Sequence, residues 1–260
     1  MISTQMFCPT IKTPIIAAAV MLLAFSCGLP ASNADVPVGG AYLVGWNADA
    51  PDGISVAIFE DLSAGDQLYF TDSGFYAAGD MRGVEKVMSW TAASDMSAGS
   101  VINIINTSTS PNANADEGTA IGNLSLSGGG DQVFIGNAPF PTTNHAIYDH
   151  SELVFGLDYN GVAGWDAESV STSTSALPPA LTLHNIAFTH QDNGVYIGPR
   201  SGLTIAQFQT AIRDESNWTF SNAVGGVALD STDFQIVPEP TSMGLLGLLA
   251  AAMAIRKRQR

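Results

Sequence analysis

The sequence predicts an all-β sandwich with one short helix, flanked by an apolar helix at each end of the chain. Short runs rich in β-branched and aromatic residues recur through the middle of the chain, between clusters of Gly, Asn, Asp and Ser, a spacing typical of a sandwich or barrel. The predicted strands are AYLVGWN (41–47), ISVAIFE (54–60), QLYFT (67–71), VMSWT (87–91), VINII (101–105), QVFIG (132–136), NIAFT (185–189), GVYIG (194–198) and DFQIV (233–237).

The one predicted helix of the body lies within LTIAQFQTAIRDESNW (203–218). Thr204 and Gln207 have the spacing of a capping box, in which each side chain satisfies a backbone N–H at the helix start. Ile205, Phe208 and Ile212 then fall on one helical face. We expect this face to pack on the sheets.

Three short segments of similar sequence support the β interpretation. DLSAGDQLYF (61–70) and DMSAGSVINI (95–104) align without gaps, and GGDQVFIG (129–136) repeats the Gly-Asp-Gln step. In each segment a Gly can supply the positive φ of a tight turn just before a strand. A true duplication is the alternative, but three short matches favour one turn type used repeatedly.

The N-terminal 34 residues have the pattern of a signal peptide. A lone Lys12 precedes an apolar run over 15–25, which is short of the ~20 residues that a membrane span needs. Small residues then end at Ala34, where a signal peptidase can cleave. Both cysteines, Cys8 and Cys27, lie in this segment, so the mature protein has no thiol. A buried N-terminal core helix is the less favoured alternative.

The C-terminus combines three features in order. Pro238-Glu239-Pro240 is stiff and extended, because each Pro fixes its own φ and restricts the residue before it. Thr241 to Ile255 carries no charge and spans ~22 Å as a helix, against ~30 Å of hydrocarbon, so it is short for a permanent anchor. The third feature is a basic cluster, which holds the C-terminal end of the apolar run in the cytoplasm. It consists of Arg256, Lys257, Arg258 and Arg260.

This order, over Val237 to Arg260, resembles the PEP-CTERM sorting tail of exported Gram-negative proteins. The resemblance implies that an exosortase cleaves near Pro238-Glu239-Pro240 and passes the body to the cell surface, in bacteria that make extracellular polysaccharide. Together with the N-terminal pattern and the strand signals, it divides the chain into a signal peptide over 1–34, an exported β-sandwich domain over 35–236 and a sorting tail over 237–260 that enters the inner membrane transiently. An ordinary tail anchor is the alternative.

The predicted mature body is strongly acidic. Residues 35–236 contain four cations and 23 carboxylates, a net charge of −19. Nucleic acids and anionic membrane surfaces are therefore poor partners, and no nucleic-acid partner is predicted, since binding either requires a basic face. The charge favours solubility, cation binding or a polysaccharide matrix bridged by cations.

Most of the body, including YLVGWNADAPDGISVAIFEDLSAGDQLYFTDSGF (42–75), resembles a family of exported bacterial β proteins of unassigned activity, and more loosely the lamin-tail-like immunoglobulin sandwiches. The second likeness is a fold analogy, which implies no activity. No catalytic residue follows from either resemblance.

Common signatures of hydrolysis, zinc binding and nucleotide binding are absent from the sequence: there is no Gly-x-Ser-x-Gly, no His-Glu-x-x-His, no phosphate loop and no Cys pair. We therefore predict a non-catalytic body. The histidines, at spacings that match no metal motif, are His145, His150, His184 and His190.

No metal or cofactor is predicted, with calcium as the alternative. The stretch 112–123 is rejected as an EF-hand, because its Gly118 comes one place late and its twelfth residue is Asn123 instead of Glu. NADAPDG and DYNGVAGWD could each wrap a hard cation with Asp49, Asp52, Asp158 or Asp166, but the same residues serve β-turns.

The sequence thus favours an exported, exosortase-processed protein of the cell surface or extracellular matrix with a structural or binding role. A carbohydrate-binding or adhesive module is the first alternative, with Trp165 in its Gly-rich loop as the candidate sugar platform, since Trp46 and Trp90 lie in predicted core strands. A secreted hydrolase is the second, with carboxylates such as Asp158, Asp166 and Glu168.

Overall fold

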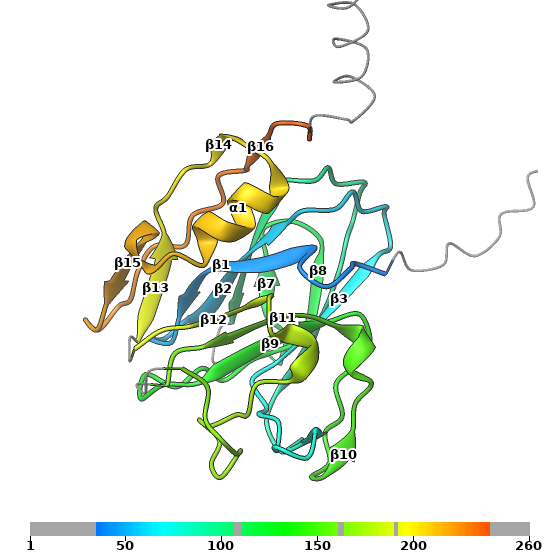
Figure 1. Ribbon diagram of the computed structural model, residues 1–260, viewed down its shortest axis with the longest axis vertical. Helices are drawn as coiled ribbons and strands as arrows, with labels where there is room; N and C mark the ends of the chain where they lie inside the picture. The colour runs from blue at the N-terminus through cyan, green and yellow to red at the C-terminus, as the bar shows by residue number, and fades with distance from the viewer. Residues whose placement is uncertain (1–34, 107–110, 161–163, 190–191, 240–260) are drawn as a thin grey trace, which may run out of the picture. The chain divides into compact units, whose positions relative to one another are not determined.

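Two six-stranded sheets pack face to face in the computed structural model, which describes residues 35–106, 111–160, 164–189 and 192–239 (Figure 1). The first sheet has the order β15 (Trp218–Ser221), β13 (Asn193–Tyr196), β1 (Ala41–Asn47), β2 (Asp52–Ile58), β6 (Val101–Asn106) and β7 (Asn114–Ala115). The second has the order β12 (Asn185–Ala187), β11 (Leu153–Asp158), β9 (Gln132–Gly136), β3 (Gln67–Thr71), β5 (Val87–Thr91) and β8 (Thr119–Gly122). Two further ribbons pair β10 (Ala146–Ile147) with β4 (Asp80–Met81), and β14 (Ser201–Leu203) with β16 (Gln235–Ile236).

Neighbouring strands in the first sheet are all antiparallel, and in the second only β11 and β12 run parallel. The registers bring apolar side chains into line across the first sheet, as where Ile54 is the partner of both Trp46 and Ile104. The predicted all-β sandwich with one short helix is therefore confirmed.

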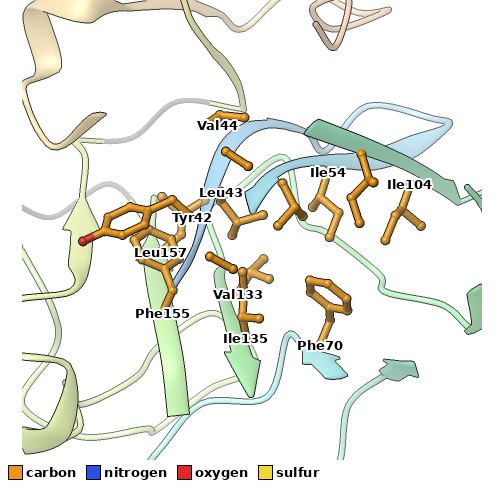
Figure 2. Packing of buried hydrophobic residues seen from close by; sticks show 14 of the residues in the cluster. Tyr42, Leu43, Val44, Ile54, Phe70, Ile104, Val133, Ile135, Phe155 and Leu157 are labelled. Carbon is orange, nitrogen blue, oxygen red and sulfur yellow. The ribbon is translucent and has the colours of Figure 1, made fainter. Parts of the chain in front are cut away.

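The main core fills the space between the two sheets (Figure 2). Leu43 and Ile54 of the first sheet face Phe70, Val133 and Ile135 of the second. Successive side chains of strand β9 point to opposite faces of the sheet, so they contribute to two different clusters. Val133 and Ile135 belong to the main core, and Phe134 belongs to a second cluster behind the sheet.

Both outer faces of the sandwich are covered as well. On the first sheet, a Cβ atom at Gly45 or Gly53 would come within 3.1 or 3.0 Å of Leu229, so the chain near Leu229 lies against β1 and β2. On the second sheet, residues of strands and of the connecting segments form the second cluster, which consists of Phe75, Met81, Phe134, Phe140, Tyr148, Leu153 and Leu181. Strands buried on two faces carry continuous apolar runs rather than alternating ones.

Helix α1 (Ile205–Ile212) begins with the predicted capping box: Gln207 N donates to Thr204 Oγ1, and Thr204 N donates to Gln207 Oε1. Phe208 and Ile212 are buried, and Ile205 packs against the core from a partly exposed position. The helix lies beside β14 and β16 at one end of the sandwich (Figure 1).

Several strand boundaries differ from those predicted. β1, β3, β5 and β9 match, whereas β12 and β16 are shorter than the apolar runs NIAFT and DFQIV. β11, the buried strand LVFGLD, was not predicted. The turns of all three similar segments have their Gly at positive φ, with φ values of 98° at Gly65, 102° at Gly99 and 103° at Gly130.

The predicted signal peptide with Ala34, the apolar run after Pro240 and the Arg-rich end lie outside the described residues. Within the described parts of the chain, no helix has the length and apolar character needed to span a bilayer.

Candidate functional site

The chain reaches the sorting segment directly from a folded strand. β16 pairs in parallel with β14, with Ser201 opposite Gln235 and Leu203 opposite Ile236. Gln235 N donates to Arg200 O at 2.7 Å, and Val237 N donates to Leu203 O at 2.9 Å. Pro238 and Glu239 follow, exposed and outside any helix or strand, so a single residue, Val237, separates β16 from Pro238.

Phe234, just before β16, fixes this segment to the core. Its side chain is 3% exposed, and its ring centroid lies 4.9 Å from that of Phe208 and 5.5 Å from that of Phe59. The Arg200 guanidinium lies 4.8 Å from the centroid of Phe234 and forms an ion pair with Asp230 at 3.3 Å. Burial of one aromatic side chain of this size stabilises a fold by about 2–3 kcal/mol.

A second feature is a cleft of about 380 Å³ that contains three carboxyl groups, Asp72, Glu85 and Asp131. Both oxygens of Asp72 accept backbone N–H groups, from Lys86 and Ser125, each at 2.7 Å. The oxygens of Asp131 likewise accept from Ser127 N at 3.0 Å and from its neighbour Gln132 N at 2.9 Å. The two aspartates therefore hold three loops together.

Burial dominates the electrostatics of this cleft. It raises the pKa of Asp72 to about 6, and burial together with the charge of Asp72 raises the pKa of Glu85 to about 8. Burial and the same neighbour also raise the pKa of Asp131 well above its usual value. Loss of solvation penalises the charged form of each group, and the like charges add to that penalty.

The cleft offers limited chemistry. Carboxylate-based glycoside hydrolysis needs two carboxyl groups that can reach the substrate, whereas Asp72 and Asp131 are only 2% and 3% exposed and each of their oxygens accepts a backbone N–H. Glu85 keeps one buried oxygen, Oε2, without a hydrogen-bond partner. The arrangement is that of structural carboxylates with one further acidic group.

The predicted hydrolase residues are only partly brought together. Asn160 links Asp158 and Asp166, since its backbone N donates to Asp158 Oδ1 at 2.9 Å and its amide to Asp166 Oδ2. Burial, followed by the charge of Asp166, raises the pKa of Asp158 to about 7. Glu168 instead accepts from Ala77 N at 2.9 Å.

The predicted calcium loops form hydrogen bonds of their own. Asp49 Oδ2 accepts from the Asn193 amide at 2.8 Å, and Asp52 Oδ2 accepts from Leu126 N at 3.0 Å. In the parts of the chain that the structure describes, no three His, Cys, Asp or Glu side chains are grouped so that they could hold a metal ion.

Trp165 is half-buried rather than displayed on the surface. Its ring lies 5.3 Å from that of Phe134, and its Nε1 donates to Asn185 Oδ1 at 3.0 Å. Trp46 and Trp90 are fully buried, as expected.

A more exposed aromatic pair lies near the ribbon of β10 and β4. Tyr76 and His145 stack with centroids 4.4 Å apart and an angle of 10° between the rings. His145 Nδ1 is 2.6 Å from Asp80 Oδ2, and Tyr76 donates to Asn144 Oδ1 at 3.0 Å. His145 also has a φ of 56°, which is uncommon for a residue other than Gly. The sequence analysis missed this pair because loops bring its members together from 69 positions apart.

Two other histidines lie at the edge of packed regions. His150 Nε2 contacts Gly79 O at 2.7 Å, and His184 Nδ1 contacts the Tyr42 hydroxyl at 3.0 Å. Burial, with a further contribution from Arg213, lowers the pKa of His184. His190 lies outside the described residues.

Comparison with known protein families places a sorting signal directly after β16. Residues 237–259 match the family described as the PEP-CTERM protein-sorting motif. The chain therefore carries the tail of an exported protein that associates transiently with the membrane and is processed by an exosortase. No curated protein matches the chain, and no solved structure does so either. The likeness of the body to exported bacterial β proteins and to lamin-tail sandwiches stays a prediction.

Proposed function

We propose that the protein is a cell-surface or extracellular-matrix component whose folded body has a structural or binding role and carries out no catalysis. The observation that supports this most directly is the sorting motif at 237–259, which begins at Val237, the last of the described residues with a backbone hydrogen bond to the body. The acidic surface and the structural use of Asp72 and Asp131 are consistent with such a role.

Intact-mass analysis of the protein recovered from the surface of its producer tests this proposal. We expect a chain that starts after Ala34 and ends near Pro238-Glu239-Pro240, with or without a covalent addition at the new end. A Glu239→Ala variant should accumulate in the membrane fraction with its tail attached. Surface-located protein that still carries Arg256 to Arg260 would contradict exosortase processing.

The second candidate function is carbohydrate binding at the stack of Tyr76 and His145. Flat rings bind the faces of sugars, and the side chains of Asp80 and Asn144 supply hydrogen-bonding groups beside them. This pair is the better platform, because Trp165 packs against Phe134.

Binding of the purified body to the producer's own polysaccharide distinguishes the two roles. Tyr76→Ala should weaken the binding about tenfold if one stacking contact worth about 1–2 kcal/mol is lost. Ile147→Ala is the matched control, since Ile147 lies in the same ribbon and is 90% exposed. Equal binding by the two variants would remove this candidate.

A further inference from the structure

The backbone groups that a processing enzyme would pair with near the sorting motif are already used in the pairing of β16 with β14. Enzymes that act on extended segments commonly bind them by pairing with their backbone groups, over several residues. After Val237 only Pro238, Glu239 and Pro240 precede the uncharged run that begins at Thr241, and three extended residues span about 10 Å. The two Pro residues lack N–H groups, so these three residues offer a single backbone donor.

The residues just before them have the donors, but the fold uses these donors. Gln235 N donates to Arg200 O, just before β14, and Val237 N donates to Leu203 O, at the end of β14. An enzyme that binds this segment as a strand must therefore compete with β14.

The enzyme can compete with β14 because the β14–β16 ribbon is small. It has three residues in one strand and two in the other. Ser201, Gly202 and Gln235 are exposed, and Leu203 and Ile236 are only partly buried against the core. Short ribbons with exposed hydrogen bonds open at little free-energy cost. Opening would stop at Phe234, because its buried ring is held by Phe59 and Phe208.

We propose that β16 is exchanged between two partners: residues 235–237 leave β14 and pair with the exosortase, while Phe234 remains fixed as the end of the body. This inference rests on the proposed processing by an exosortase and adds the segment that the enzyme takes from the fold. Release of the three residues extends the accessible chain by about another 10 Å. Because the fixed point lies before the released residues, the sandwich stays folded throughout.

A disulfide across the ribbon tests the exchange. Ser201 and Gln235 are register partners with exposed side chains, neighbouring Cα atoms in a sheet are within the reach of a disulfide, and the body has no cysteine of its own. The oxidised Ser201→Cys/Gln235→Cys variant should be converted from precursor to mature chain about tenfold more slowly than either single variant in the producing cells. The reason is that cleavage requires β16 to leave β14, and the disulfide makes the open form of the ribbon rare. Addition of a reductant should restore the rate.

A second variant keeps the test independent of disulfide formation. Four Gly and Ser residues inserted between Val237 and Pro238 supply free backbone without opening the ribbon, so they should speed conversion of the otherwise unchanged chain and rescue the oxidised variant. Conversion of the oxidised variant at the single-variant rate, or an insertion that leaves conversion unchanged or slower, would overturn the exchange. Failure of the unchanged chain to lose its tail would instead overturn the proposed function.

Discussion

The turns at 61–66 and 95–100 have nearly the same sequence and lead into strands of opposite sheets, β3 and β6. They also contact each other reciprocally. Asp61 Oδ1 accepts from Ala98 N at 2.8 Å, and Asp95 Oδ1 accepts from Ala64 N at 2.9 Å. Leu62 and Met96 exchange both backbone hydrogen bonds, at 2.8 Å each.

The surroundings of the two turns differ. A Cβ on Gly65 would meet no atom within 4 Å, whereas a Cβ on Gly99 would overlap the carbonyl oxygen of Phe234. Phe234 N in turn donates to Gly99 O at 2.7 Å. The local sequence thus specifies the same turn twice, while the packing of the C-terminal segment leaves space for a Cβ atom at Gly65 and none at Gly99.

The largest difference is expected between Gly99→Ala and Gly65→Ala. Each places a side chain at positive φ, which costs about 1 kcal/mol, and Gly99→Ala adds about 2 kcal/mol because the backbone at Phe234 must move. Urea unfolding followed by circular dichroism measures both. Equal losses of stability would show that the contact with Phe234 has no energetic consequence.

The reciprocal aspartates should have equal and smaller effects. Asp61→Ala and Asp95→Ala each remove one acceptor for a backbone N–H and should each cost about 0.5–1 kcal/mol, because both side chains are exposed. Val224→Ala, at a side chain 99% exposed, is the neutral control in the same unfolding experiment. A marked inequality between the two aspartates would break the symmetry of the pair.

The third turn extends the comparison to the carboxylate cleft. Asp66 and Asp131 follow the Gly of their turns, and each accepts a backbone N–H from a Ser earlier in the same turn, Ser63 at 2.8 Å and Ser127 at 3.0 Å. Asp131 differs in having Asp72 and Glu85 as neighbours, whose charges contribute to its raised pKa. In the third turn, the neighbouring carboxyl groups thus add to the effect of burial on the pKa of Asp131.

Glu85→Gln should change how stability depends on pH. The pKa of Glu85 is about 8 in the folded state, so between pH 4.5 and 8 the folded state binds more protons than the unfolded state, and stability falls as pH rises. The variant lacks this loss and should be more stable relative to the wild type at pH 9 than at pH 5. The effect is modest, because Glu85 is partly exposed and solvent screens its charge.

Thermal unfolding at the two pH values and at matched salt checks this expectation. Glu60→Gln is the control, since Glu60 is exposed. A pH dependence that is the same in the Glu85→Gln variant and the wild type would assign it to groups other than Glu85.

The smallest effect is expected from calcium. The acidic loops at Asp49, Asp52, Asp158 and Asp166 bond to amides of the chain, so millimolar calcium should leave the thermal midpoint unchanged relative to magnesium at equal ionic strength. A calcium-specific rise that a chelator reverses would reveal a ligand bound by the folded state, and would place a cation at one of these turns.

The sequence predicted features that are local and contiguous. The capping box of Thr204 and Gln207 and the turns at Gly65 and Gly99 depend on residues within a few positions, and the sorting motif is an uninterrupted segment. β11 was missed because LVFGLD is buried on both faces and lacks the alternation of a half-exposed strand.

The cleft could not be predicted for a different reason. Glu85 lies 13 positions after Asp72, and Asp131 lies 46 positions after Glu85. Their raised pKa values arise largely from burial that only the assembled loops produce. The stack of Tyr76 on His145 depends in the same way on loop packing. No spacing rule relates such residues, because their separation in sequence is set by loop length.

The outermost strands of both sheets are short: β15 and β8 have four residues, β12 three and β7 two. Few unpaired amides and carbonyls are therefore available at the rims for another molecule to extend the sheet, a common protection against fibre formation. At high concentration, separate copies of the folded body therefore have little exposed strand edge through which to add to one another's sheets.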